Sequence, residues 1–179
     1  MENSSIFIRK ANLNDIAGIM TVECLSFPDS VIESQKVFED RISLFSDGFL
    51  VALFENKIIG YISSELWRFS ENVPLSNFTL NHPIFETHHG DGEELYISSI
   101  AVDPKFRGSG IGKHLFEELL KNVPEKYNLL SLILLVSSNW ERAFSMYQKK
   151  GFIEINRIPD FFSLGEDGII MRNQLKTDE

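Results

Sequence analysis

The chain has 179 residues, of which 43% are hydrophobic and 24% are charged, and its formal net charge at pH 7 is −9. This length supports one well-buried core and is too short for two comfortable domains, so we expect a single domain over residues 1–179. The acidic surface would repel nucleic-acid phosphates and anionic lipid headgroups, so we expect neither nucleic acid nor a membrane as partner. The single cysteine excludes an intramolecular disulfide. With no signal-peptide pattern and no apolar run of membrane-spanning length, the sequence predicts a cytoplasmic protein.

The first elements of the chain are a strand and two helices. Residues 6–11, "IFIRKA", predict a strand, and Asn12 or Asn14 can cap the helix that follows. The apolar residues of this helix have helical spacing, and the helix ends before Pro28. A second helix fits residues 34–45, whose apolar side chains also lie on one side.

A hairpin and a long irregular segment come next. Residues 48–67 hold two β-rich runs around a turn at 55–57. Residues 68–93 contain two prolines, three histidines and little periodicity. Because connections of this length in a compact domain are usually functional or mobile, we interpret the segment as a lid or a substrate-facing insertion. Its histidines and acids lack the spacing of a zinc site, so we expect a solvated loop and no metal. These side chains are His82, His88, His89, Asp91 and Glu93.

The second half begins with a strand that leads into a glycine-rich stretch. Residues 94–102, "ELYISSIAV", predict the strand, and a helix with a continuous apolar stripe follows residues 107–113 and runs to about Asn122. Residues 129–136, "LLSLILLV", are apolar on both faces. That pattern is typical of a central parallel strand.

The last quarter predicts a helix and a closing strand pair. Ser138 and Glu141 match a capping box, and Gly151 stands where helices end with a left-handed residue. Residues 152–158 and 168–175 then predict an antiparallel pair around a turn.

The stretch "RGSGIGK", residues 107–113, carries the strongest chemical signal. It follows a strand and opens a helix, so several backbone N–H groups lack intrahelical partners. Without β-carbons at its three glycines an anion can lie against these groups, and Arg107 and Lys113 add positive charge. The spacing does not fit the P-loop, which needs glycine at 107, nor the dinucleotide fingerprint, whose third glycine would fall on Lys113. We predict a phosphate or pyrophosphate site; the alternative is a turn that serves only tight packing.

Several motifs together resemble the GCN5-related N-acetyltransferases, the GNAT family. Residues 107–112 match its Q/R-x-x-G-x-G/A signature, and "YISSIAV", the Asp103-Pro104 junction and "YQKKGF" at 147–152 match as well. The resemblance runs over nearly the whole chain, and the opening "FIRKANLNDI" is similar to members that act on arylalkylamines and polyamines. It implies an α/β protein with the GNAT fold. That fold has a mixed, mostly antiparallel sheet of about six to seven strands, a central splayed parallel pair, and about four helices on both faces.

The resemblance also implies that acetyl-CoA is the co-substrate, without a metal. The glycine loop would wrap the pyrophosphate, and the pantetheine arm would pair like an added strand beyond a bulge in the preceding strand. A backbone N–H near Val102 could then polarise the thioester carbonyl, which makes Val102 a catalytic position. The cofactor-binding residues expected on this basis are Ile100, Ala101, Val102, Arg107, Gly108, Ser109, Gly110, Ile111, Gly112, Lys113, Asn139, Ala143 and Tyr147.

Two residues near the end of the motif region have expected roles. Tyr147 matches the general-acid tyrosine of the family and shares a helix face with Ala143; a phenol there can protonate the leaving thiolate. Its alternative role is packing under the sheet. Asn139 matches a family asparagine that contacts the cofactor arm, and its alternative role is to satisfy backbone donors at the helix start.

The general base is left open by the sequence. Glu94 and Glu23 are candidates, although each is otherwise expected to be a solvated surface charge. In arylalkylamine acetyltransferases two histidines align with Tyr96 and Ser98, so this chain departs from that proton relay, and Tyr96 is a substitute to consider. Cys24 lies on a mostly apolar helix, so we expect it in the core and not as an acetyl-carrying nucleophile.

These features predict an enzyme that transfers the acetyl group of acetyl-CoA to a primary amine by direct attack in a ternary complex. A small-molecule amine is the main prediction, because an insertion at 68–93 would close a small pocket more readily than it would admit an extended peptide. A protein N-terminus or lysine is the alternative acceptor. A non-catalytic acyl-CoA-binding module is a further alternative, although the chain retains both Tyr147 and Asn139. Since many relatives pair as dimers, the resemblance allows a homodimer.

Overall fold

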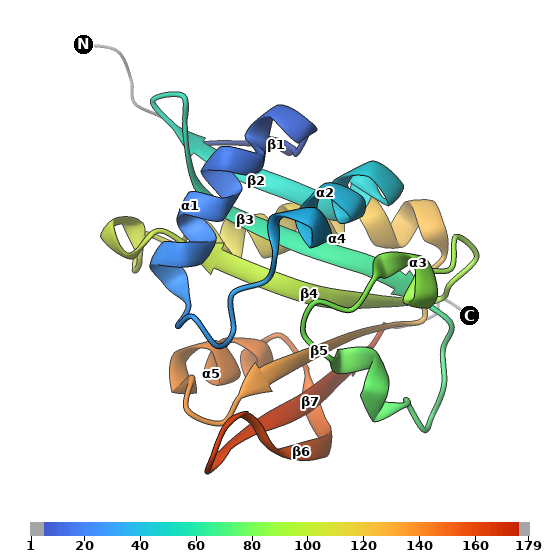
Figure 1. Ribbon diagram of the computed structural model, residues 1–179. Coiled ribbons are helices and arrows are strands. Elements are labelled where there is room, and N and C mark those ends of the chain that lie inside the picture. The colour runs from blue at the N-terminus through green and yellow to red at the C-terminus, as the bar shows by residue number, and fades with distance from the viewer. Residues whose placement is uncertain (1–5, 176–179) are drawn as a thin grey trace.

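The computed structural model describes residues 6–175, which form a seven-stranded sheet with helices on both faces (Figure 1). The strand order is β1-β2-β3-β4-β5-β7-β6, and every neighbouring pair is antiparallel except β4 and β5. The strands are β1 (Phe7–Lys10), β2 (Phe49–Phe54), β3 (Lys57–Trp67), β4 (Glu94–Val102), β5 (Ser131–Ser137), β6 (Ile153–Ser163) and β7 (Glu166–Gln174). The helices are α1 (Ile16–Ser26), α2 (Gln35–Leu44), α3 (Ile84–Thr87), α4 (Ile111–Tyr127) and α5 (Glu141–Lys149). The predicted mixed sheet is confirmed, and α3 is a short helix beyond the four predicted.

Apolar layers lie on opposite faces of the sheet. Side chains of α1 and α2 pack with Phe49, Val51 and Tyr61 on one face. The cluster on the other face joins Leu50 and Ala52 with side chains of α4 and α5. Because successive side chains of a strand point to opposite faces, β2 must be apolar throughout to fill both layers. Figure 1 shows α1 and α2 in front of the sheet and α4 behind it.

The parallel strands β4 and β5 separate halfway along their length. Their pairing ends at Ile97 and Leu134. The next residue of β4, Ser98, is an extra residue without a partner in the β3 register. Such a bulge bends a strand and redirects its backbone groups. Beyond it, residues 99–102 stay paired with β3 while residues 135–137 pair with β7, so a gap opens at the carboxyl ends of both strands. The predicted splayed pair with its bulge is confirmed.

The start of α5 differs from the prediction. The helix begins after Trp140 without a side-chain cap, so the predicted capping box of Ser138 and Glu141 is wrong. The Ser138 hydroxyl instead accepts a hydrogen bond from the backbone N–H of Asp167 at 3.1 Å, which ties this loop to β7. The other end agrees with the prediction, since Gly151 has the left-handed φ of +88° that terminates the helix.

The segment from 68 to 93 packs against the sheet and is not the solvated loop that we expected. Phe78 is buried edge-on against Tyr96 of β4. His82 is also buried, and its Nε2 bonds to the carboxylate of Glu65 on β3. The prediction failed because aromatic and imidazole side chains of the segment find buried partners on the sheet. In the part of the chain that the structure describes, no helix has both the length and the apolar composition that crossing a membrane requires.

Candidate active site

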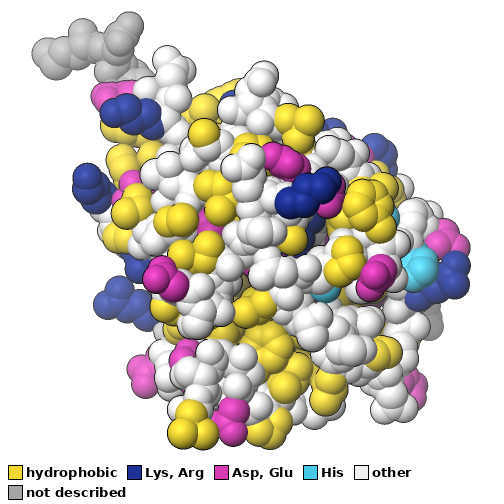
Figure 2. Space-filling view, viewed as in Figure 1, with side chains coloured by type: hydrophobic (Ala, Val, Ile, Leu, Met, Phe, Trp, Pro, Cys, Tyr) yellow, Lys and Arg dark blue, Asp and Glu magenta, His cyan; other side chains and the backbone are white. Residues whose placement is uncertain are grey.

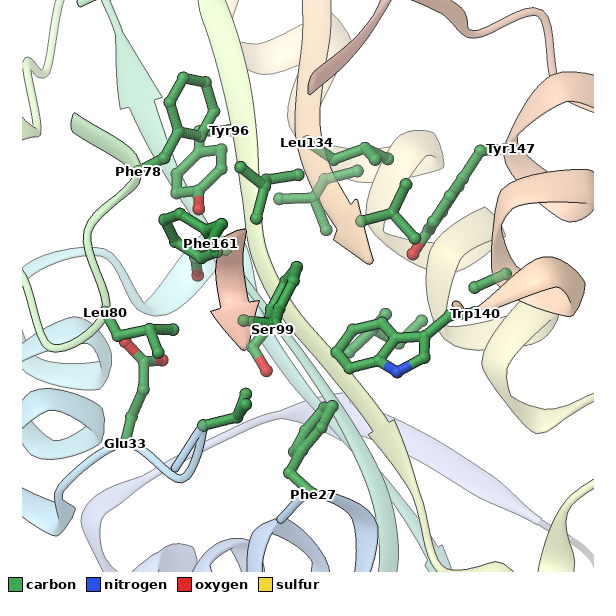
Figure 3. Close-up of a pocket in the computed structure, with 18 of the residues that line it drawn as sticks. Phe27, Glu33, Phe78, Leu80, Tyr96, Ser99, Leu134, Trp140, Tyr147 and Phe161 are labelled. Carbon is green, nitrogen blue, oxygen red and sulfur yellow. The ribbon is translucent and has the colours of Figure 1, made fainter. Parts of the chain in front are cut away.

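A pocket occupies the gap between β4 and β5 (Figure 3). Its walls come from the ends of both strands, α5, β6, the loop after α1 and the segment 68–93. The lining is mostly apolar, and its charged residues among those described are Glu23 and Glu33. Ligands of open α/β sheets usually bind where neighbouring strands diverge at their carboxyl ends, and this pocket has that location.

The end of β4 presents unpaired backbone donors to this gap. The carbonyl oxygen of Val102 accepts hydrogen bonds from the Ser26 hydroxyl at 3.3 Å and from Arg107 Nε at 3.1 Å, on the side away from β3. Backbone direction alternates along a strand, so the N–H groups of Val102 and Ile100 face the gap, while those of Ala101 face β3. These donors can pair with an extended ligand or polarise a carbonyl group.

The glycine loop is open to the outside. Gly108 and Gly110 have φ values of +84° and +85°, a region that favours glycine. No atom lies within 4 Å of the position that a β-carbon would take at either residue. Because α4 starts at Ile111, its first-turn N–H groups point toward this open loop. Arg107 does not stand free at the rim, since it bonds to the end of β4 through Val102.

The remaining loop residues lie around the same helix start. The Ser109 hydroxyl donates to the carbonyl oxygen of Phe106. A β-carbon at Gly112 would make only ordinary contact with Val102, at 3.7 Å, so no steric clash requires glycine there. The exposed Lys113 lines a second cleft, between α4 and α5, which is rich in cations. The basic residues of that cleft are Lys113, Arg142, Lys149 and Lys150.

Tyr147 on α5 directs its hydroxyl into the pocket (Figure 3). Its side chain is 4% exposed, and the hydroxyl has no hydrogen-bond partner among the described residues. Burial raises the pKa of Tyr147, so the phenol remains protonated and able to donate. Ala143, one turn earlier, lines the same pocket. The structure therefore brings together the pair that the sequence placed on one helix face.

Asn139 lies outside the pocket and is exposed to solvent. The next residue, Trp140, lines the pocket and packs against Phe27, with ring centroids 5.6 Å apart, and against Phe162, at 5.0 Å. Sequence reasoning missed Trp140 because an aromatic residue after a strand carries no motif of its own.

Glu94 lies far from the gap, at the amino end of β4, and does not line the pocket. Its carboxylate pairs with Arg172 of β7, at 2.7 Å and 3.1 Å, and accepts from the Ser131 hydroxyl at 2.7 Å. Glu94, Arg172 and Ser131 are all buried, so the expectation that Glu94 is a solvated surface charge is wrong. An ion pair between neighbouring strands is a structural arrangement, and nothing in it reaches the pocket.

Glu23 on α1 is buried as well, at 1% exposure, and it does line the pocket. Its carboxylate accepts hydrogen bonds from the Tyr61 hydroxyl and from the backbone N–H of Glu33. Burial raises the pKa of Glu23, and these hydrogen bonds oppose part of the rise. The expected solvated charge is again wrong, because α1 turns this residue toward β3 together with Ile19.

Tyr96 on β4 supplies a second phenol to the pocket (Figure 3). Its ring stacks on Trp67 with centroids 4.0 Å apart. Within the described chain its hydroxyl has no hydrogen-bond partner, and burial raises its pKa, so it is a neutral donor rather than a base. It lies four residues before Ile100, on the side of the gap that faces the segment 68–93.

Two further expectations concern cysteine and metal. Cys24 is exposed, so the expectation that it lies in the core is wrong. Among residues 6–175, no group of three or more histidine, cysteine, aspartate or glutamate side chains is arranged to hold a metal ion.

Three comparisons with known proteins agree with this geometry. The sequence model of the Acetyltransferase (GNAT) family matches residues 16–152. An N-alpha-acetyltransferase of Sulfurisphaera tokodaii is 27% identical over 165 residues, which cover 92% of this chain and 90% of the relative. The loading GNATL domain of CurA from Lyngbya majuscula has a TM-score of 0.80 at 13% identity, with 95% of this chain and 98% of that chain covered.

A further solved structure has the same fold. Arabidopsis thaliana Naa50, in complex with the bisubstrate analogue CoA-Ac-MVNAL, has a TM-score of 0.72 at 20% identity, with 96% of this chain and 99% of that chain covered. At such identities a structural likeness shows the fold alone, whereas the family match covers well over half of the sequence. The family match over residues 16–152 agrees with the open glycine loop and the splayed strands. The chain therefore belongs to the GNAT family of acetyltransferases.

Proposed function

We propose that this acetyl-CoA-dependent N-acyltransferase acetylates the α-amino group of a polypeptide N-terminus. The observation that carries the proposal is the match to an N-alpha-acetyltransferase over 92% of this chain and 90% of the relative. The sequence analysis preferred a small-molecule amine, because the segment 68–93 was expected to close a small pocket. The nearly full-length match supports the alternative acceptor, the protein N-terminus, better than that main prediction.

The chemistry of the pocket supports an amine carried next to an apolar group. Phe78 and Leu80 of the segment 68–93 contribute apolar side chains, as does Phe161 of β6 (Figure 3). The charged lining residues are the carboxylates Glu23 and Glu33, which favour an ammonium group over a carboxylate or a phosphate. On the face shown in Figure 2, hydrophobic side chains gather over β5 and the β6–β7 hairpin. We therefore expect acceptors whose first residue is apolar.

The site proposed for acetyl-CoA uses backbone groups in two places. Its pyrophosphate lies against the first-turn N–H groups of α4, over Gly108 and Gly110, where nothing obstructs an anion. Its pantetheine arm lies along the open edge at Ile100 and Val102 as an added strand. The thioester carbonyl then reaches an N–H donor that can stabilise the oxyanion of the transition state.

Transfer in this site needs a nucleophilic attack by the neutral amine, the loss of one proton from its nitrogen to solvent, and one protonation of the leaving sulfur. The amine nitrogen attacks the thioester carbon, an amide bond forms, the C–S bond breaks, and CoA leaves as a thiolate. Tyr147 donates its phenolic proton to that thiolate and is reprotonated from solvent. Its free hydroxyl and raised pKa fit this role, because the donor must hold its proton until the sulfur becomes basic.

The test is acetylation of short peptides that differ in their first residue, run beside arylalkylamines and polyamines. We expect mass spectrometry to locate the acetyl group on the α-amine, with apolar first residues preferred. An N-formylated copy of the best peptide, with an internal lysine, is the control and should stay unmodified. Acetylation of small amines alone, or of the internal lysine alone, would contradict the proposal.

A further inference from the structure

A chain of hydrogen-bonded side chains runs from the pocket into the core under α1. The Tyr61 hydroxyl on β3 lies 2.9 Å from the Ser99 hydroxyl on β4 and donates to the carboxylate of Glu23. The second carboxylate oxygen of Glu23 accepts from the backbone N–H of Glu33 at 3.0 Å. Of the three hydrogen-bonded side chains Ser99, Tyr61 and Glu23, the first and the last line the pocket.

Glu23 differs from the other buried acids of the described chain in having no cation bonded to it. Each of the others forms an ion pair with an arginine or a histidine: Asp15 with Arg9, Glu33 with Arg41, Glu65 with His82, and Glu94 with Arg172. A buried carboxylate without such a partner costs folding free energy. Arrangements of this kind concentrate at functional sites, where an ionisable group must change its protonation state.

We propose that Ser99, Tyr61 and Glu23 form the relay that removes the proton from the acceptor amine, with Glu23 as the final acceptor. The inference rests on the proposed amine acetylation, but not on which amine is the acceptor. Ser99 directly precedes Ile100, whose N–H faces the gap, so its side chain lies next to the strand edge along which the pantetheine arm is proposed to bind. Figure 3 shows the Ser99 side chain directed into the pocket.

The proton transfer balances without another reactant. Before the attack, one proton of the acceptor's ammonium group passes to the Ser99 oxygen, which leaves a neutral amine that can attack the thioester carbon. The hydroxyl proton of Ser99 passes to the Tyr61 oxygen, and the proton of Tyr61 passes to Glu23. Ser99 and Tyr61 end neutral, as they began, and Glu23 changes from a carboxylate to a carboxylic acid. Its proton returns to solvent after the amide product leaves.

The surroundings of Glu23 suit a group that accepts a proton more readily than an ordinary glutamate does. Burial raises the pKa of this carboxyl, while the hydrogen bonds from Tyr61 and from the backbone of Glu33 lower it. Among nearby charges, Glu33 raises this pKa and Arg41 lowers it. A carboxylate of raised pKa is a stronger base. Burial also raises the pKa of Tyr61 well above its usual range, so the phenol stays neutral between transfers.

The kinetic test compares Glu23→Gln and Tyr61→Phe with the wild type at saturating acetyl-CoA. At pH 7 we expect kcat/KM for the acceptor to fall about 100-fold, within the usual range for a general base. The difference in kcat/KM between the variants and the wild type should become smaller above about pH 8, where a free α-amine loses its proton in solution. The KM for acetyl-CoA should not change. Tyr127→Phe is the matched control, because it removes a phenol that bonds Asp47 outside the pocket; its rate should stay within about twofold of the wild type.

Two kinetic outcomes would overturn the relay. One is a Glu23→Gln enzyme with the rate and the pH profile of the wild type. The other is a loss of rate that is equally large at high pH, since a packing defect does not depend on the protonation of the amine. If small amines are acetylated and peptides are not, the same variants are compared with that amine, so a wrong acceptor is distinguished from a wrong relay.

A spectroscopic test needs no acceptor. In protein labelled with ¹³C at the glutamate carboxyls, the Glu23 signal is assigned by its loss in Glu23→Gln. It should titrate above the ordinary glutamate pKa of 4.5, and higher again in Tyr61→Phe, because that variant lacks the phenol donor. Titration at the ordinary value in both proteins would overturn the proposal.

Discussion

Tyr147 combines a packing position in the core with a hydroxyl group for which we propose a chemical role. Its ring lies 6.1 Å from the ring of Phe116 and 5.7 Å from that of Phe152, in the core between α4, α5 and the sheet. Only its hydroxyl reaches the pocket. The two roles proposed for it in the sequence are therefore compatible, because the ring and the oxygen serve different neighbours.

Replacing Tyr147 with phenylalanine separates these roles. The ring contacts remain, so we expect the melting temperature and the affinity for CoA to be nearly unchanged. Loss of the proton donor should lower kcat about 100-fold, the usual range for general acid catalysis. Release of free thiol measures the rate, and titration calorimetry measures CoA binding. Equal turnover in the two proteins would remove Tyr147 from the chemistry.

Glu94, unlike Tyr147, does not reach the pocket, and its interactions hold neighbouring strands together. Replacement by alanine leaves the buried Arg172 without its carboxylate, and we expect a loss of about 3 kcal/mol in the free energy of unfolding. The double variant Glu94→Leu with Arg172→Met should recover most of that loss, because it buries no unpaired charge. Urea denaturation measures both. A stable Glu94 variant with strongly reduced kcat would return this residue to the list of candidate bases.

At the scale of elements, the loop before α4 is the proposed anion site, and that proposal depends on its backbone. Its left-handed glycines leave the helix start uncovered, and their own contacts with the rest of the protein are few. Binding of an anion there depends on N–H groups that no side chain supplies. The glycine pattern in the sequence was therefore sufficient to locate the loop.

Gly110→Glu tests this use of the loop. The new carboxylate lies where the pyrophosphate is proposed to bind, so like-charge repulsion should lower the CoA affinity on the order of 100-fold, or about 2.8 kcal/mol. Gly165→Glu is the matched control. It also has a left-handed glycine, at φ +80°, with no atom near its missing β-carbon, but it lies in the turn between β6 and β7. Equal affinity in the two variants would refute the loop assignment.

The segment 68–93 is held to β3 by the buried pair of His82 and Glu65, with Thr87 donating to the same carboxylate. Burial lowers the pKa of His82, but the hydrogen bond and charge of Glu65 outweigh this and raise it above 6.5. Burial raises the pKa of Glu65, but its bonds to His82 and Thr87 bring it below 4.5. The pair is therefore most stable between these two pKa values, and its stabilisation is lost at both low and high pH.

A histidine with a raised pKa in the folded state stabilises the protein fully below its unfolded pKa. That contribution is lost as the pH rises through the folded pKa. We expect the free energy of unfolding to fall more steeply with rising pH above about 6.5 in the wild type than in His82→Gln. His114→Gln changes an exposed histidine and should keep the wild-type slope. Equal slopes in all three proteins would mean that the ion pair does not anchor the segment.

At the scale of the whole molecule, the sheet creates the site by separating two of its strands. β4 is held by β3 and β5 is held by β7, so the gap persists without a ligand. The helices α4 and α5 lie behind the gap and supply the loop and Tyr147, while α1 supplies Glu23 from the other face. The side chains for which we propose chemical roles thus reach one pocket from both layers of the fold.

The mixed sheet with its splayed parallel pair was implied by the resemblance to the GNAT family. The sequence by itself determined the order of elements and the position of the glycine loop. Each of these follows from a local pattern: alternating or continuous apolar residues for strands, helical spacing for helices, and glycines before a helix start. Such patterns need no knowledge of distant contacts. The predicted capping box failed for the same reason, since Ser138 is bound by a residue of β7 that is 29 positions away.

The tertiary structure decided which acids serve the pocket and which serve the fold. Glu94 and Glu23 are equivalent in the sequence, but Glu94 meets Arg172 across 78 positions and Glu23 meets Tyr61 across 38. The register of the sheet and the rotation of α1 determine these partners, and neither is encoded by local spacing. A carboxylate becomes an ion pair or a base according to what lies beside it after folding, because burial and neighbouring groups set its protonation.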